Sequence, residues 1–161
     1  MMSRVKIPDE RLPVLIGKGG TVKQFIEEKT GVSISVHDEI VIEGDALSVL
    51  TAETMVQAIG RGFALDATKT LLDENATLLV IQLPKERNAL VRTKARIIGT
   101  RGKAKRKIEH MTGAEIAVYG KTVSVIGEYG HAHRARIAIE MLLNGSPHKN
   151  VYKFLSDSVS L

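Results

Sequence analysis

One residue pattern occurs twice in this sequence, 82 residues apart, and this repeat constrains the fold more than any other feature. The first copy reads LIGKGG at residues 15–20 and, after nine residues, TGVSISV at residues 30–36. The second copy reads IIGTRG at residues 97–102 and, again after nine residues, TGAEIAV at residues 112–118. Because a self-match at one spacing identifies a structural unit, the chain is expected to contain two small, similar domains.

The first domain, predicted over residues 1–75, has clear helix and strand signals. Asp9 is a suitable N-cap, and Gly31 is typical of a residue that ends a helix. Val22, Phe25 and Ile26 recur at helical spacing, which predicts that Phe25 lies in the core. In order, we expect a strand at 4–7, helices at 9–16 and 21–30, hairpin strands at 34–36 and 40–42, and a helix at 46–59.

The second domain, predicted over residues 76–161, repeats this order. We expect a strand at 77–83, helices at 86–98 and 103–111, hairpin strands at 116–118 and 123–125, and a helix at 131–143. Two segments lie outside the repeat, a connector with a short helix at 67–72 and a short C-terminal helix within 146–155. Because no low-complexity linker separates the halves, we expect them to pack as a fairly rigid tandem.

The G-x-x-G turns indicate that each unit binds a phosphate backbone. Glycines allow a phosphate backbone to approach closely, and the N–H groups that begin the next helix favour negative charge. A G-x-x-G turn between two helices, followed by an alternating strand, resembles a KH domain, which clamps single-stranded nucleic acid. The expected fold class is α+β: two tandem type I (eukaryotic-type) KH domains, each a three-stranded antiparallel sheet packed on three helices, plus the connector and C-terminal helices.

Three groups of residues are candidates for RNA contact. The two loops supply Gly17, Lys18, Gly19 and Gly20, and Gly99, Thr100, Arg101 and Gly102. An aliphatic floor for bases is expected from Ile34, Ile98, Ile116 and Val118, together with Ile16, Val22, Val36 and Ala104. Phosphate contacts are expected from Arg96, Lys103, Lys105 and Arg106. The alternatives are core packing for the aliphatic residues and solvent exposure without contact for the cations.

Charge is distributed unequally between the two domains. Residues 1–75 hold 8 Lys and Arg against 12 Asp and Glu, a net charge of −4, whereas residues 76–161 hold 15 against 6, a net charge of +9. A polyanion partner accounts for both the basic cluster and the adjacent loop, so the second domain is expected to hold most of the RNA.

Several other classes of function are not supported by the sequence. With no cysteine, the chain has no disulfide, thiol chemistry or thiolate metal site, which fits a cytoplasmic setting. No apolar run approaches a membrane span, and no cleavable signal pattern is recognised. His131 and His133 diverge on a helix and make a poor metal pair. No residues assemble an active site, so we expect neither an enzyme nor a cofactor.

A more specific resemblance covers nearly the whole chain. It is carried by VQAIGRGF at 56–63, RIIG at 96–99, YGKTV at 119–123 and AIEMLLNG at 138–145, followed by His148, Val151 and Tyr152. These segments resemble the archaeal tandem KH-domain small-subunit ribosome-assembly factor, the counterpart of the eukaryotic partner-of-Nob protein. Eukaryotic members carry an N-terminal extension and a degenerate first G-x-x-G; the sequence shows neither, which favours an archaeal source.

The resemblance implies a non-catalytic protein that binds single-stranded RNA near the 3′ end of precursor small-subunit ribosomal RNA and assists its processing. The implied partners are the pre-ribosomal particle, the endonuclease that trims this end and a translation initiation factor subunit. Two alternatives remain open from the residues themselves. The acidic first domain is one candidate for docking a protein partner, or the chain is an RNA-binding module in transcription or mRNA control.

Overall fold

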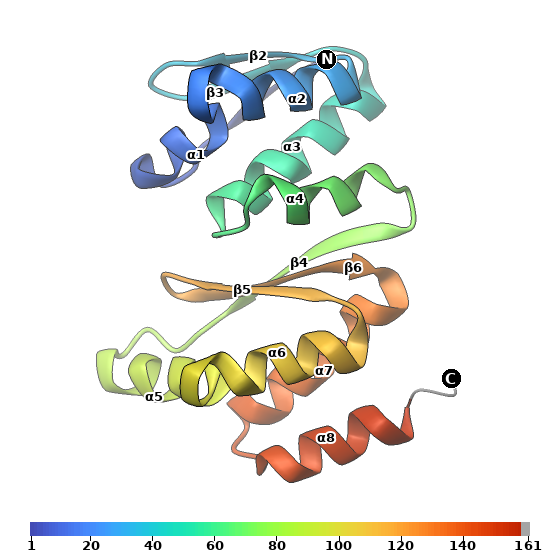
Figure 1. Ribbon diagram of the computed structural model, residues 1–161. Coiled ribbons are helices and arrows are strands. Elements are labelled where there is room, and N and C mark those ends of the chain that lie inside the picture. The colour runs from blue at the N-terminus through green and yellow to red at the C-terminus, as the bar shows by residue number, and fades with distance from the viewer. Residues whose placement is uncertain (159–161) are drawn as a thin grey trace. The chain divides into compact units, whose positions relative to one another are not determined.

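The predicted repeat is present in the three-dimensional structure, a computed structural model that describes residues 1–158. The chain divides into two units, one from Met1 to Glu74 and the other from Asn75 onward (Figure 1). Within residues 1–158, no helix combines the length and the apolar character needed to cross a membrane.

The first unit is an antiparallel sheet of three strands in the order β1-β3-β2, with helices packed on one face (Figure 1). Its elements are β1 (Met2–Val5), η1 (Asp9–Arg11), α1 (Leu12–Ile16), η2 (Lys18–Gly20), α2 (Thr21–Thr30), β2 (Ser33–Val36), β3 (Ile40–Glu43), α3 (Ala46–Gly60), α4 (Leu65–Thr68) and η3 (Lys69–Leu72). The short helices α4 and η3 form the predicted connector and pack against α3.

The second unit has the same topology, with sheet order β4-β6-β5. Its elements are β4 (Ala76–Gln82), α5 (Arg87–Ile98), η4 (Thr100–Gly102), α6 (Lys103–Thr112), β5 (Glu115–Tyr119), β6 (Thr122–Glu128), α7 (Tyr129–Leu143) and α8 (His148–Asp157). The C-terminal helix α8 packs against α6 and α7, on the side of those helices that faces away from the sheet (Figure 1). The expected α+β fold with two three-stranded sheets is therefore confirmed.

The hairpins set the correspondence between the two units. In the first, Val36 pairs with Ile40, and in the second, Tyr119 pairs with Thr122. The second unit has one additional residue here, so corresponding positions differ by 82 before the hairpin and by 83 after it. The helices α3 and α7, each of 15 residues, follow this offset from end to end.

Two expectations for the first unit were wrong in detail. Asp9 does not cap one long helix; Pro8 occupies the N-cap, and the segment divides into η1 and α1. A continuous α-helix would need an N–H at position 13 to bond the Asp9 carbonyl, and Pro13 has none. Phe25 is partly exposed rather than in the core. Its ring lies beneath the ammonium groups of Lys29 and Lys69, at 5.8 and 4.9 Å from its centroid.

The helix that leads into the second loop is fixed at its start by a carboxylate. Glu86 is the N-cap of α5 and accepts hydrogen bonds from the N–H groups of Asn88 at 2.9 Å and Ala89 at 2.7 Å. These two donors lower the pKa of Glu86 below its ordinary value. The Glu86 carboxylate thus satisfies two N–H groups that a helix start leaves without partners.

Candidate nucleic-acid interface

The first glycine of each loop is required by packing within the protein. Gly17 and Gly99 both have φ of +75°. A Cβ at Gly17 would lie 2.5 Å from Val22 Cγ2, and a Cβ at Gly99 would lie 2.7 Å from Ala104 Cβ. Any side chain at these positions would push apart the helices on either side of the turn.

The last glycines of the loops have a different role, because no helix packs against them. A Cβ at Gly19 or Gly20 would meet no atom within 4 Å, and one at Gly102 would meet only the flexible Arg106 guanidinium, at 2.9 Å. These positions leave room for an RNA backbone to approach. In the second loop Arg101 takes the place of Gly19 and adds a cation at this surface.

The loops also lead into the positive ends of two helices. Gly20 and Gly102 are the N-caps of α2 and α6. A glycine N-cap has no side chain to accept from the first N–H groups of the helix, so these donors are available for an anion. Both loops therefore have the geometry of a phosphate-binding turn.

The second loop is surrounded by cations that differ in exposure and in whether they form an ion pair within the protein. Arg101, Lys103 and Arg106 are exposed. Lys105 is held in an ion pair with Glu109 at 3.3 Å, and only about 30% of its side chain is exposed. The structure therefore leaves three of the predicted loop-region cations free to reach an RNA strand, while the charge of Lys105 is partly neutralised.

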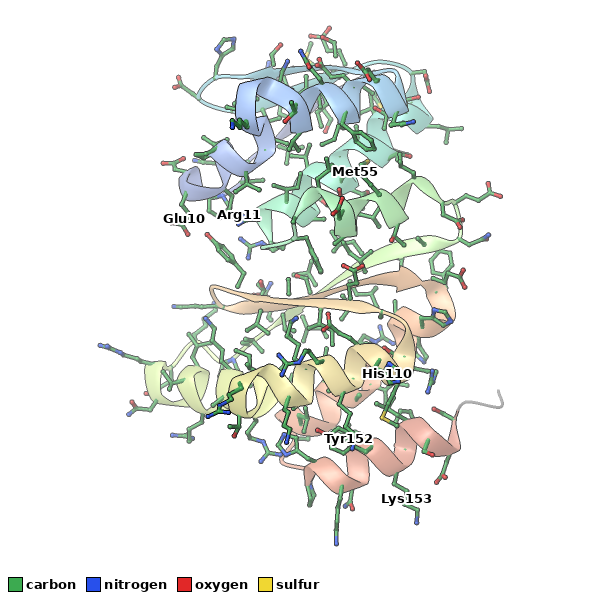
Figure 2. The ribbon with its side chains drawn as sticks, in the orientation of Figure 1. Glu10, Arg11, Met55, His110, Tyr152 and Lys153 are labelled. Carbon is green, nitrogen blue, oxygen red and sulfur yellow. The ribbon has the colours of Figure 1, made fainter. Side chains whose placement is uncertain are left out.

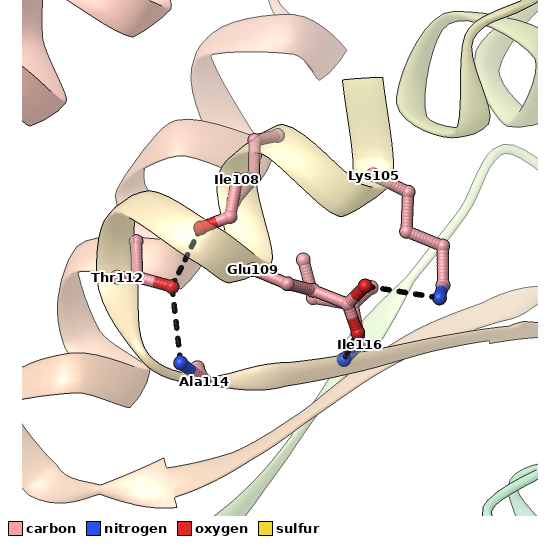
Figure 3. A network of polar contacts seen from close by, with 6 residues as sticks. All are labelled: Lys105, Ile108, Glu109, Thr112, Ala114 and Ile116. Carbon is pink, nitrogen blue, oxygen red and sulfur yellow. Dashed lines mark hydrogen bonds and ion pairs between the residues drawn. The ribbon is translucent and has the colours of Figure 1, made fainter. Parts of the chain in front are cut away.

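The Glu109 carboxylate also holds the edge strand of the sheet (Figure 3). Its second oxygen accepts a hydrogen bond from the Ile116 N–H at 2.9 Å. The first unit repeats this network, with Lys23 paired to Glu27 at 3.3 Å and Glu27 accepting from the Ile34 N–H at 2.9 Å. In both units the network fixes the helix after the loop to the neighbouring strand.

The aliphatic residues predicted as a floor are divided between the core and the surface. Ile34 and Ile116 are each only 3% exposed, so they support the surface from below. Ile98 and Val118 are partly exposed, and Ile16 is 38% exposed. A base could therefore contact Ile16, Ile98 and Val118 directly. Contact of a base with the buried Ile34 and Ile116 stays a prediction.

Arg96 is an internal anchor as well as a candidate phosphate ligand. Its guanidinium donates to the carbonyls of Leu142 at 3.4 Å and Ser146 at 2.6 Å. In the first unit Arg11 donates to the carbonyls at the equivalent positions 59 and 63, at 2.7 and 2.9 Å. The two arginines are not at corresponding positions in the repeat, so the sequence comparison did not connect them.

Two residues near the second loop were missed as functional candidates. Tyr152 on α8 lies beneath the ammonium group of Lys107, at 4.1 Å from its ring centroid, and burial raises the pKa of its phenol. His148, one turn earlier, bonds through Nε2 to the Arg96 carbonyl at 2.8 Å. The only available signal was that both lie in the segment that carries the family resemblance.

Comparison with known proteins agrees with this geometry. Residues 2–58 match the KH domain family, and residues 76–160 match the family described as the eukaryotic type KH-domain (KH-domain type I). Dim2p from Pyrococcus horikoshii is 41% identical, with a TM-score of 0.92 over 98% of this chain and 99% of that one. The chain belongs to the tandem KH-domain family of archaeal Dim2p.

Two further relatives extend the comparison. A KH domain-containing protein of Methanocaldococcus jannaschii is 41% identical over 94% of this chain and 71% of its own length. The structure of an a/eIF2alpha–aDim2p–rRNA complex from Pyrococcus horikoshii matches with 41% identity and a TM-score of 0.90, over 98% of this chain and 93% of that one. This chain is thus a KH-domain RNA-binding protein.

No enzyme family is indicated by these matches. Among residues 1–158 there is also no group of three or more His, Asp or Glu side chains that could hold a metal ion.

Proposed function

We propose that this protein is a non-catalytic factor of small ribosomal subunit assembly that holds the unpaired 3′ region of small-subunit ribosomal RNA. The second KH unit carries most of the RNA, and the bound end is presented for processing. The observation that supports this most directly is the second loop, where only the flexible Arg106 guanidinium lies near Gly102, Arg101 adds a cation and α6 begins.

The proposed partners follow from the relatives. One structure of a close relative contains ribosomal RNA together with a/eIF2alpha, so we propose a translation initiation factor subunit as a partner here. The endonuclease that trims the 3′ end is proposed on the family resemblance.

The test places negative charge where a phosphate should lie. Replacing Thr100→Asp together with Arg101→Asp should lower affinity for single-stranded RNA of this 3′ region by at least about tenfold, ~1.4 kcal/mol, in fluorescence anisotropy. Both glycines remain, and aspartate tolerates the left-handed conformation at position 101 better than most residues. Circular dichroism should therefore show an unchanged fold.

The matched control lies in the first loop. Lys18→Asp with Gly19→Asp introduces the same two carboxylates, and a side chain at position 19 meets no neighbour. Because Gly19 has φ of +64°, the aspartate there is strained, and the unfolding curve of this variant is measured alongside its affinity. We expect a smaller loss of affinity from this variant, because its unit carries a net charge of −4. Unchanged affinity in the folded second-loop variant would remove that loop from the RNA site.

A second role is favoured by the chemistry of the first unit. Lys23 is paired with Glu27, and Lys29 and Lys69 lie over Phe25, so these cations are already engaged within the unit. We propose that this acidic unit docks a protein partner while the second unit holds RNA. Loss of partner binding, with RNA binding retained, on charge reversal of its exposed carboxylates would support this division.

A further inference from the structure

A shallow, open pocket lies beside the second loop, between α5, α6 and the C-terminal helix α8. Its volume is about 410 Å³, within the range of small-ligand sites. We call it the α8 pocket; its lining residues are Ala95, Arg96, Gly99, Thr100, Lys103, Ala104, His148 and Tyr152. Gly99 and Thr100 belong both to the loop and to this pocket, so a strand that crosses the loop can continue into it.

The polar part of the α8 pocket is suited to a phosphate. Lys103 brings an exposed cation and Thr100 a hydroxyl group. Arg96 adds a guanidinium that keeps further N–H donors beyond the two bonded to the Leu142 and Ser146 carbonyls. Two helices, α6 and α8, begin in its wall, at Lys103 and His148, and the N-terminal end of a helix favours an anion. His148 bonds to the Arg96 carbonyl at 2.8 Å, which occupies one of the acceptors at the end of α5.

The apolar part is suited to a base. Ala95, Ala104 and the ring of Tyr152 contribute carbon surface. Tyr152 lies on the side of α8 that faces α6 (Figure 2). The ammonium group of Lys107 covers the ring at 4.1 Å, and the His148 ring lies 6.2 Å away at 46°. These neighbours hold the Tyr152 ring in place, and the part of the ring that lines the pocket offers a surface against which a base can stack.

The first unit provides an internal comparison. The positions that correspond to Arg96, Lys103, His148 and Tyr152 are Val14, Thr21, Leu65 and Lys69. None of the four pocket residues keeps its chemistry there, although the backbone topology is the same. The combination of cations, imidazole and aromatic ring is therefore particular to the second unit and is not a requirement of the fold.

We propose that the α8 pocket binds one nucleotide of the single-stranded RNA, adjacent to the nucleotides that cross the second G-x-x-G loop. The phosphate lies against Lys103, Arg96 and the ends of α6 and α8, and the base lies against Tyr152. This proposal rests on the proposed function, since it adds a contact to the same strand. It predicts that the second unit contacts more nucleotides of the strand than the KH groove alone accommodates.

The experiment compares two RNAs on the full chain. One has about four nucleotides, enough for a KH groove, and the other extends this sequence on both sides to about ten. Tyr152→Leu removes the aromatic ring, and His148→Gln retains a donor for the Arg96 carbonyl. Each variant should reduce affinity for the long RNA, with Tyr152→Leu losing at least about fivefold, the lower end for a stacked base, and short-RNA affinity should be unchanged.

The control is Lys153→Ala, which removes a positive charge from an exposed residue of α8 that does not line the pocket. It should change the two affinities equally and little. An equal loss of both affinities in Tyr152→Leu would show that α8 only supports the domain, and no loss of either would also overturn the proposal. Adenosine monophosphate that binds wild type but not Tyr152→Leu, without an RNA-length effect, would indicate a free-nucleotide site instead and refute the RNA assignment.

A failure of the proposed RNA-binding function can be distinguished from a failure of the pocket proposal. If Thr100→Asp with Arg101→Asp leaves short-RNA affinity unchanged, the proposed function fails at the loop. The pocket is still tested by the effect of Tyr152→Leu on the long RNA.

Discussion

At the scale of single residues, the most informative position is Arg101. Among residues 1–158 it is the one non-glycine with a positive φ, +57°, and the first loop has Gly19 at the corresponding place with φ of +64°. A non-glycine residue in this conformation costs roughly 1–2 kcal/mol. Local strain of this kind is found at functional sites, and here it places an arginine at the loop surface that we propose to face RNA.

Arg101→Gly should therefore change stability and binding in opposite directions. Relief of the strain stabilises the folded protein, whereas the extra freedom of glycine in the unfolded chain offsets part of this gain. Together they should raise the free energy of unfolding by up to about 1 kcal/mol. RNA affinity should fall because a cation is lost. Urea denaturation and anisotropy measure the two effects, and Gly19→Arg is the reciprocal variant, expected to be less stable than wild type. A fall in both quantities for Arg101→Gly would contradict this account.

At the scale of elements, α2 and α6 have the same length and the same Lys–Glu–strand network, but different charge. At the positions of Lys103 and Arg106 in α6, α2 has Thr21 and Gln24. Both cations of α6 are exposed beside the loop. Each phosphate contact on a single strand contributes about −0.7 to the slope of log affinity against log salt. The number of cations on α6 should therefore be visible in the salt dependence.

Lys103→Thr with Arg106→Gln converts this surface to that of α2. The slope should become shallower by up to about 1.4, the value for two lost contacts, when anisotropy is measured over a salt series. Lys149→Thr with Lys153→Gln removes the same charge from exposed positions on α8 and should leave the slope nearly unchanged. Equal changes in the two variants would mean that net charge alone determines binding.

Most elements could be predicted from the sequence, because the repeat, the glycines and the apolar spacing are local signals. The break of the first helix also has a local signal, the absent N–H of Pro13, which the apolar spacing of the segment does not reveal. Whether Ile34 and Ile116 pack in the core or face a base could not be decided from the sequence, and the anchoring of Arg96 could not be predicted, since both depend on partners distant in sequence. The carbonyls that bind Arg96 lie 46 and 50 residues away along the chain.

At the scale of the whole molecule, two units with one topology carry opposite net charge, −4 and +9. The topology explains why both halves have the loop geometry, and the charge explains why they should not contribute equally to RNA binding. A KH groove reads bases that are unstacked and splayed, so a paired strand does not fit it. The form of the RNA should therefore matter as much as its sequence.

The unpaired 3′ segment of small-subunit ribosomal RNA should compete for the full chain at least about tenfold better than the same segment annealed to its complement. Competition anisotropy at fixed salt measures this ratio. Equal competition by duplex and single strand would show that the basic surface acts as a general polyanion site. Ile116→Asp should weaken binding of the unpaired form. Because Ile116 is buried, the unfolding curve of this variant must also be measured, so that a folding defect is not mistaken for a loss of binding.

The hydrogen bonds from Ile34 and Ile116 to Glu27 and Glu109 have a consequence for self-association. Strands β2 and β5 form one edge of each sheet, and an open edge invites strand addition from another molecule. In each case an outward N–H of the edge is already occupied by a carboxylate of the same chain. An incoming strand would find this donor blocked by an ion-paired carboxylate, so the side chain that fixes the helix after the loop should also disfavour strand addition at this edge.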